Sequence, residues 1–387
     1  MKILLIGNES GCPDFIKYAN DRGLTLTVVS EKEWLSALTL DLTDYHEILS
    51  FSDTGQILVE RIKKHGNIIG RGEDLIGRLT NKKRLREEKN LSHLFSQYVI
   101  FSATDCIESC EQLYQRKNLC FPLIVKPASG FYSAGVSRVD EAAGLPRAIS
   151  LARRINNQIN GTKGDVIIEE YLTGKEVAID GIIHEGIIYP LIYHTKYPKL
   201  KGPFFHEEAY ISKTVQQDFP EMQPLKQFIA ALELKSGPFH IEMRQCNQEK
   251  WYLLECAPRF SGMGLSTNIP FFSLTGQHAY DFLLWPHLMS TQRWRYDNGH
   301  VLEFDFAVKY SAPLTGIDTV VAKIRALSHC VFFQYANNGD IVLAPPNNLN
   351  AFLTVFCHVT TFIEAISLYQ LLKTFENELY CNLSKTA

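Results

Sequence analysis

The chain has 387 residues, of which 45% are hydrophobic and 21% are charged, and its formal net charge is −3. This length exceeds what one ordinary hydrophobic core holds, so we expect two or three domains. The small net charge gives no electrostatic reason to expect a nucleic acid or an anionic membrane as a partner, and no apolar run reaches the length of a transmembrane helix.

The nine cysteines form no recognisable metal-binding or redox motif. The closest couple, Cys106 and Cys110, has no second pair and no histidine at the spacing of a zinc site. We therefore expect most cysteines to be small core residues and the protein to work in the reduced cytoplasm.

The first 95 residues predict a small α/β domain. Strands are expected at 2–7, 24–30, 48–52 and 67–70, and helices at 13–22 and 55–65. The strand, helix, strand order is typical of a parallel, doubly wound sheet. The G-x-G-x-x-G fingerprint is absent, so the sequence does not support dinucleotide binding.

The next stretch places lysines where phosphate could bind. A charged helix begins near Thr80–Arg84 with Thr80 or Asn81 as its cap, and its lysines either face solvent or reach a phosphate. The apolar strand FPLIVK ends in Lys126, which must find an anion or extend to water. The loop that follows is rich in Gly, Ser and Ala, so its backbone N–H groups and the hydroxyls of Ser129 and Ser133 can approach a triphosphate.

A helix at 145–159 precedes an apolar strand at 165–168 that runs into Glu169-Glu170-Tyr171-Leu172. This strand exit is either an ordinary charged turn or a place where backbone groups contact an adenine edge and the acids contact its amino group or the ribose. Further strands are expected at 177–183, 189–193 and 210–212, and a helix at 221–235. The loop between the last two of these strands carries Lys196, Lys199, Lys201 and His206, which face either a substrate or solvent.

Two short β-prone runs around Asn247–Lys250 predict a hairpin within 237–264. If the turn centres between Gln248 and Glu249, Glu242 lies opposite Glu255, Ile241 opposite Cys256 and Met243 opposite Leu254. Two carboxylates directly opposite repel each other unless they are solvated or share a divalent cation, and oxygen ligands of this kind suit magnesium. Beyond this hairpin, strands are expected at 300–310 and 330–334, a strand and a helix within 316–328, and a closing helix at 361–380.

Four segments together, FPLIVKPASGFYSAGVSRV, VIIEEYLTGKEVAIDG, GPFHIEMR and LLECAPRFSGMG, resemble the ATP-grasp superfamily in order and spacing. Within it, the chain is most similar to carboxylate–amine ligases such as L-amino acid ligases and purine-pathway ligases. The resemblance covers roughly residues 80 to 285. It implies a multidomain α/β and α+β fold, with a Rossmann-like pre-ATP-grasp domain at 1–95, a small lobe at 96–172, a large lobe with a metal site at 173–298 and a small β-rich α+β region at 299–387.

The resemblance also implies roles for single residues. Arg259 would steady the transferred phosphoryl group, Glu242 and Glu255 would bind magnesium, with manganese as an alternative, and Glu176 would hold the ribose. The implied ATP-binding residues are Lys82 (or Lys83), Lys126, Ser129, Ser133, Ala134, Glu169, Glu170, Tyr171, Leu172, Glu176 and Leu254, and Lys126 and Arg259 are the implied catalytic residues. By their charge Lys196, His206 and Arg259 favour an anionic or amino-acid substrate, and Gly262 is expected beside them.

One position departs from the family pattern. Family members commonly have asparagine two residues after the second acid, whereas this chain has Ala257, which offers no metal ligand. The expected activity is amide formation from a small carboxylate and a small amine through an acyl-phosphate, by a monomer or a homodimer. The alternatives are an ATP-binding protein with weak or no ligase activity that acts through a partner, and phosphorylation or thiol ligation at the same site.

Overall fold

The computed structural model describes residues 1–107, 114–115, 117–130, 133–160, 164–202, 205, 207–215, 219–247, 250–291, 297–307, 311–343 and 351–383. Three sheets of three or more strands organise these residues, and a short pair, β14 (Ala312–Pro313) with β16 (Ile341–Val342), lies apart from them. No helix within the described ranges is both long and apolar enough to cross a membrane.

The N-terminal sheet is parallel, as the order of its elements predicts. Its strand order is β2-β1-β3, formed by β1 (Lys2–Ile6), β2 (Thr25–Val29) and β3 (Glu47–Leu49) with α1 (Pro13–Asp21) and α2 (Asp53–His65). The strand predicted at 67–70 is wrong. Asn67 takes a positive φ of 55° just after α2, which interrupts an extended strand, and Ile69 is 95% exposed although Ile68 packs against the core beside α2. Helices α3 (Glu73–Leu79) and α4 (Lys82–Glu87) lead from here to the second sheet.

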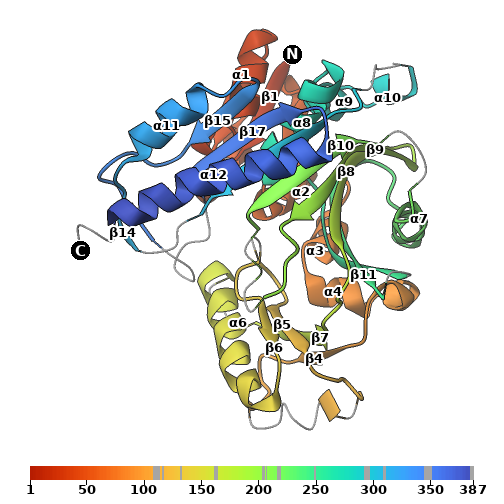
Figure 1. The fold of residues 1–387 in the computed structure, drawn as a ribbon. Coiled ribbons are helices and arrows are strands. Elements are labelled where there is room, and N and C mark those ends of the chain that lie inside the picture. The colour runs from red at the N-terminus through yellow and green to blue at the C-terminus, as the bar shows by residue number, and fades with distance from the viewer. Residues whose placement is uncertain are drawn as a thin grey trace.

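The second sheet has four antiparallel strands in the order β4-β7-β5-β6. They are β4 (Tyr98–Phe101), β5 (Leu123–Pro127), β6 (Ser137–Val139) and β7 (Val166–Glu170). Helix α6 (Leu145–Asn160) covers one face through Leu145, Ile149 and Ala152, and in Figure 1 sheet and helix form a lobe below the rest of the molecule.

The third sheet has eight strands in the order β12-β11-β8-β9-β10-β13-β17-β15, and every pairing is antiparallel. The strands are β8 (Glu176–His184), β9 (Ile187–Tyr197), β10 (Ala209–Thr214), β11 (Gly237–Cys246), β12 (Lys250–Ala257), β13 (His300–Phe306), β15 (Cys330–Gln334) and β17 (Leu353–Val359). The last three strands extend this sheet rather than build one of their own. Region 316–328 holds helix α11 (Ile317–Arg325) without the strand also expected there.

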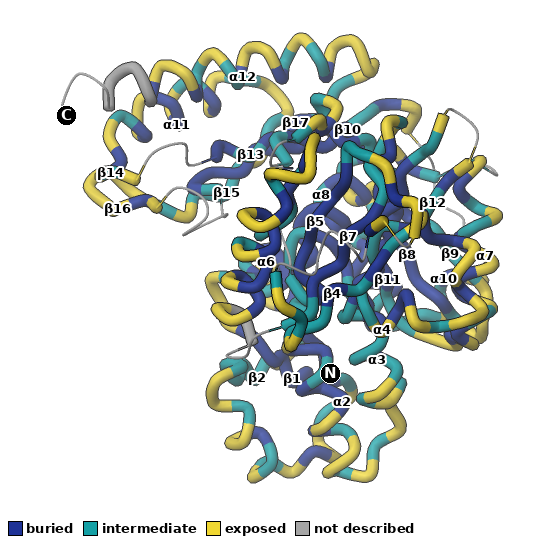
Figure 2. The backbone as a smooth tube through the Cα atoms, turned by 90° about the horizontal axis from the view of Figure 1, so that it is seen from below, coloured by how far each residue is buried: buried dark blue, intermediate teal, exposed yellow. Residues whose placement is uncertain are grey.

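The remaining helices lie against this sheet or close its connections. They are α7 (Met222–Ala231), α8 (Leu265–Thr275), α9 (Ala279–Leu284), α10 (Leu288–Thr291) and α12 (Phe362–Leu383). Figure 2 shows that buried residues run through the strands, whereas the outer faces of α6, α7 and α12 are exposed.

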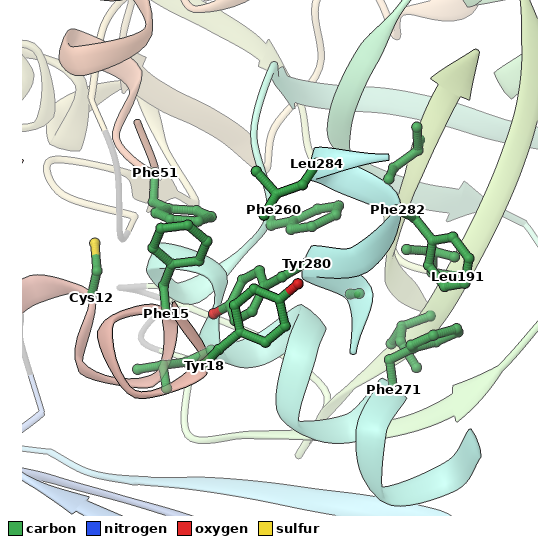
Figure 3. Packing of buried hydrophobic residues seen from close by; sticks show 14 of the residues in the cluster. Cys12, Phe15, Tyr18, Phe51, Leu191, Phe260, Phe271, Tyr280, Phe282 and Leu284 are labelled. Atoms are coloured by element: carbon green, nitrogen blue, oxygen red, sulfur yellow. The ribbon is translucent and has the colours of Figure 1, made fainter. Parts of the chain in front are cut away.

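An aromatic cluster joins the N-terminal sheet to α8 and α9. The ring of Phe15 on α1 lies 5.0 Å from those of both Phe51 and Tyr280, and Phe260 and Phe271 belong to the same core (Figure 3). Burial of such rings stabilises the contact by roughly 1.5–3 kcal/mol for each side chain. The cluster therefore holds the loop before α2 close to the loop before α8.

The cysteine prediction is only partly correct. Cys12 and Cys256 are buried, but Cys106 and Cys120 are exposed. Cys330 and Cys357 lie directly opposite each other on β15 and β17 and form a disulfide. The cytoplasmic location stays a prediction.

Candidate active site

One cavity of about 550 Å³ is lined by residues of the four-stranded and eight-stranded sheets and of the loops before α2 and α8. Most residues singled out in the sequence line it, namely Lys82, Lys126, Ser133, Ala134, Glu169, Glu170, Tyr171, Leu172, Glu176, Glu242, Leu254, Glu255, Arg259 and Gly262. Lys196 is not among the lining residues, but its ammonium contacts Glu176 and Glu242, which are. Ser129 is turned aside, because its hydroxyl accepts a hydrogen bond from the Asn81 amide at 3.1 Å. His206 lies outside the described residues.

The hairpin places its two acids opposite each other, as predicted by counting residues outward from the turn. Glu242 pairs with Glu255 and Ile241 with Cys256. The expected pairing of Met243 with Leu254 is wrong, because a bulge after Glu242 shifts the register and Met243 pairs with Leu253. As a result both Leu254 and Glu255 reach the cavity. The centre of the turn, Gln248 and Glu249, lies outside the described residues.

Helix α4 directs Lys82 into the cavity and Lys83 away from it. The ammonium of Lys82 lies 2.8 Å from the Glu255 carboxylate and donates to the Gly130 carbonyl at 2.9 Å. Lys83 instead contacts Asp165 at 2.8 Å. Asn81 caps the helix by accepting from the N–H groups of Lys83 and Arg84.

Lys126 is buried among charges at the end of β5. Its ammonium contacts Glu169, whose other oxygen lies 2.6 Å from the guanidinium of Arg86. Burial, together with the charge of Arg86, lowers the pKa of Lys126 to about 8, although Glu169 opposes the shift. Arg86 lies four residues after Lys82, on the same face of α4, so the fully solvated helix face is the wrong alternative here.

A buried cluster of three acids surrounds Lys196. Carboxylate oxygens of Glu176, Glu207 and Glu242 lie within 4.8 Å of one another, and the Lys196 ammonium contacts them at 2.7, 2.5 and 2.9 Å respectively. The Lys196 side chain is only 2% exposed, so the solvent-facing alternative is wrong for this lysine. Burial raises the pKa of Glu207 to about 7, since Glu242 adds to the effect and Lys196 only partly offsets it.

A second buried network positions Glu242. The Asp180 carboxylate contacts the Nε2 of His194 at 2.7 Å and the Nδ1 of His240 at 2.8 Å, and it accepts hydrogen bonds from the hydroxyls of Ser261 and Thr267. The other ring nitrogen of His240 lies 3.3 Å from Glu242. Burial alone would raise the pKa of Asp180, but His240 and His194 lower it below its ordinary range.

Replacing Asp180 by asparagine should lower the free energy of unfolding by about 3–5 kcal/mol, because two buried imidazoles lose their anionic partner. The folded-state pKa of Asp180 is depressed, so its contribution is present at neutral pH and is lost only as the pH falls below the ordinary range of a carboxyl group. Urea unfolding at pH 7 measures the effect. The exposed Asp21→Asn serves as control, and we expect a change of at most about 1 kcal/mol for it.

Residues around the start of α2 complete the cavity, and no motif in the sequence predicts their role. Both carboxylate oxygens of Asp53, at the start of α2, accept hydrogen bonds from Arg259, at 2.8 and 3.2 Å. Glu31, Ser52 and Thr54 line the same wall. Gly262 lies opposite them with a φ of 53°, and a Cβ there would meet the Ser266 hydroxyl at 2.0 Å. Only glycine fits this position without displacing Ser266.

Residues 119–267 match the family model of the ATP-grasp domain. The whole chain superposes on the L-amino acid ligase from Bacillus licheniformis with a TM-score of 0.77 at 18% identity, covering 96% of this chain and 97% of that one. The chain therefore contains a segment similar to the ATP-grasp domain, and its fold is that of the ligase. A second solved structure, N5-carboxyaminoimidazole ribonucleotide synthetase in its ADP complex, gives a TM-score of 0.72 at 14% identity over 98% of this chain and 97% of that one.

Sequence similarity to curated ATP-grasp proteins is more limited. The chain is 26% identical over 168 residues to alanine–anticapsin ligase from Bacillus amyloliquefaciens. That match spans 38% of this chain and 35% of the relative, about a third of its length. The structural likeness therefore extends over the whole ATP-grasp fold, while the sequence likeness is confined to part of it.

Proposed function

We propose that this ATP-grasp protein is an ATP- and magnesium-dependent carboxylate–amine ligase that releases ADP and phosphate. The observation that carries the proposal is that one cavity is lined both by the cations Lys82 and Lys126 and by the acid pair Glu242 and Glu255. Cations suit the phosphates of ATP, and paired carboxylates suit the metal that accompanies them.

The donor set fits a hard divalent cation. Glu242 and Glu255 would hold magnesium or manganese, since both offer carboxylate oxygens to the cavity and Ala257 offers none. When bound, the metal supplies positive charge to the phosphate oxygens. Glu207 and Glu176 are further oxygen donors beside Glu242, although Lys196 neutralises them in this structure.

The chain's own residues carry the other parts of the reaction. Lys82 and Lys126, which line the cavity, bind and orient the phosphates, and the proposed contact for the adenine is the backbone at residues 170–172, which line the same cavity. The substrate carboxylate attacks the γ-phosphoryl group, which gives an acyl-phosphate and ADP. Arg259 neutralises charge on the transferred group. The amine then attacks the carbonyl carbon, phosphate leaves, and the two ammonium protons in excess of the amide pass to solvent.

An amino acid is the proposed carboxylate or amine substrate. Relatives named for alanine–anticapsin ligation and L-amino acid ligation share parts of this sequence or this fold. Of the cations expected at the substrate, Arg259 lines the cavity and agrees with an anionic group there, whereas Lys196 is buried behind the lining and paired with three carboxylates. The cytoplasm as location and a homodimer as assembly stay predictions.

A screen of ADP release over pairs of amino acids, with ATP and magnesium, tests the proposal. The expected result is ADP release that requires both an acid and an amine, with a product whose mass equals the sum of the two substrates less one water. A phosphorylated or thiol-linked product would instead establish one of the other reactions.

The second candidate is an ATP-binding protein with little ligase activity, and Ala257 together with the neutralised acid cluster favours it. Calorimetry with ATP and magnesium separates the two. Tight binding without turnover on any pair supports the second candidate, and turnover eliminates it.

ATP affinity should fall at alkaline pH because of Lys126. Its pKa of about 8 in the free protein rises when a phosphate lies beside it. Below pH 8 the ammonium is already charged and affinity is flat, whereas at pH 9 binding requires proton uptake and should be about tenfold weaker than at pH 7. Calorimetry in two buffers of different ionisation enthalpy measures both quantities. Lys126→Met should bind ATP weakly and without this pH dependence, and equal wild-type affinity at both pH values would contradict the assignment.

A further inference from the structure

A second cavity of about 700 Å³ lies behind the first one, across the eight-stranded sheet. Residues that are adjacent in the sequence, in or beside the same strand, line different cavities. Arg244 and Glu176 line the first, whereas Gln245 and Lys175 line the second. Successive side chains of a strand point to opposite faces of the sheet, so only the thickness of the sheet separates the two cavities.

This second cavity contains a buried carboxylate with an unsatisfied oxygen. Glu221 is 2% exposed, and its Oε1 accepts a hydrogen bond from the Tyr193 hydroxyl at 2.8 Å. Within the part of the chain that the structure describes, its Oε2 has no hydrogen-bond partner. Native proteins rarely leave a buried acceptor of this kind unpaired, because desolvation costs about 1–3 kcal/mol and more for a charged group. The free oxygen therefore calls for a donor from a ligand.

The rest of the lining includes cationic and apolar groups, together with a second acid, Asp297. The Lys213 ammonium lies 5.4 Å from the centre of the Tyr193 ring. Burial lowers the pKa of His300, which also lines this cavity, and the positive charge of Lys213 lowers it further. Phe219 and Trp251 add apolar surface. An anion, a cation and an apolar wall in one cavity match the three parts of a zwitterionic ligand with an apolar side chain.

We propose that the second cavity binds a free amino acid with an apolar side chain, whose ammonium contacts Glu221 and whose carboxylate faces Lys213. The inference does not depend on the proposed ligase function, because Glu221 and Lys213 do not line the first cavity. The ligand would be bound on the rear face of the strands that carry Glu176, Lys196 and Arg244.

Calorimetric titration of the full chain with L-leucine tests the proposal, alongside 3-methylbutylamine, which lacks the carboxylate, and 4-methylpentanoate, which lacks the ammonium. We expect saturable binding of L-leucine and at least about tenfold weaker binding of both analogues. Glu221→Gln should weaken L-leucine binding by about tenfold or more and leave ATP affinity unchanged. Glu233→Gln, an exposed acid just beyond the end of α7, is the matched control and should bind like wild type.

Lys213→Met provides an independent variant at an exposed position, should Glu221→Gln fail to fold. Its L-leucine affinity should fall by a similar factor, and its affinity for 3-methylbutylamine should not change. Absence of saturable L-leucine binding to wild type would overturn the proposal. So would binding that survives in both variants but is lost in Arg259→Ala, because the ligand would then occupy the first cavity.

Discussion

Replacing Glu255 by glutamine should reduce ADP release by about 10²- to 10³-fold, the usual loss when one preorganised charge contact to a transferring group is removed. Glu255 faces Glu242 across the hairpin and lies 2.8 Å from the Lys82 ammonium. Glutamine keeps the shape but removes the negative charge that a metal requires. Steady-state ADP release over a range of magnesium concentrations measures the loss, and excess magnesium should restore only part of the activity.

The fold should survive this substitution, because the Glu255 side chain is 30% exposed and its contact with Lys82 is made through the carboxylate group alone. An unchanged melting temperature would show this. Glu185→Gln, at an exposed turn between β8 and β9, is the matched control and should release ADP at the wild-type rate. A Glu255→Gln protein that turns over near the wild-type rate would remove Glu255 from the proposed metal site.

Replacing Arg259 by alanine should cause a loss of comparable size, and the expected pattern separates two roles of this residue. In the structure Asp53 holds the guanidinium through two hydrogen bonds. If Arg259 serves the phosphoryl group, Arg259→Ala lowers the maximal rate by about 10²-fold or more, with little effect on ATP affinity. Single-turnover measurements at saturating ATP distinguish a slower chemical step from weaker binding.

Asp53→Asn supplies the comparison for this second prediction. It retains a hydrogen-bond acceptor but removes the charge that holds Arg259, so we expect a far smaller loss than in Arg259→Ala. If Asp53→Asn and Arg259→Ala impair the protein equally, in rate and in melting temperature, the ion pair is structural. Arg259 would then have no role in the transfer.

Much of the site could be predicted from the alternation of side chains along strands, which places every second residue on the same face of the sheet. His240, Glu242 and Arg244 alternate on β11, and the same face of β8 carries Glu176 and Asp180. Because His240 and Arg244 lie two residues before and after Glu242, the same alternation predicts that they too face the site. The i, i+4 spacing of Lys82 and Arg86 likewise predicts that both lie on the same face of the helix.

Other features depend on long-range packing that local patterns do not encode. The bulge after Glu242 follows from no residue in the hairpin that we can identify, yet it turns Leu254 toward the cavity. Asp53 lies 206 residues before Arg259, and only the folded chain brings the two together. Glu207 is only 11 residues from Lys196, but it lies in the connection between β9 and β10, where no local pattern predicts the contact. The sequence pattern predicts that the strand at 165–168 ends before Glu169, whereas β7 continues through Glu170 and Glu169 contacts Lys126 and Arg86.

The continuity of the eight-stranded sheet has a consequence for any shortened form of this protein. Cutting the chain at the predicted boundary, residue 298, would remove β13, β15 and β17 and convert β10 into an edge strand. Its exposed N–H and C=O groups would then be free to pair with other chains, which favours aggregation. β10 also carries Tyr210, whose hydroxyl contacts Glu207. The C-terminal region thus protects the part of the cavity that Glu207 and Tyr210 line. We expect it to be indispensable for a stable protein even though none of its strands lines that cavity within the described residues.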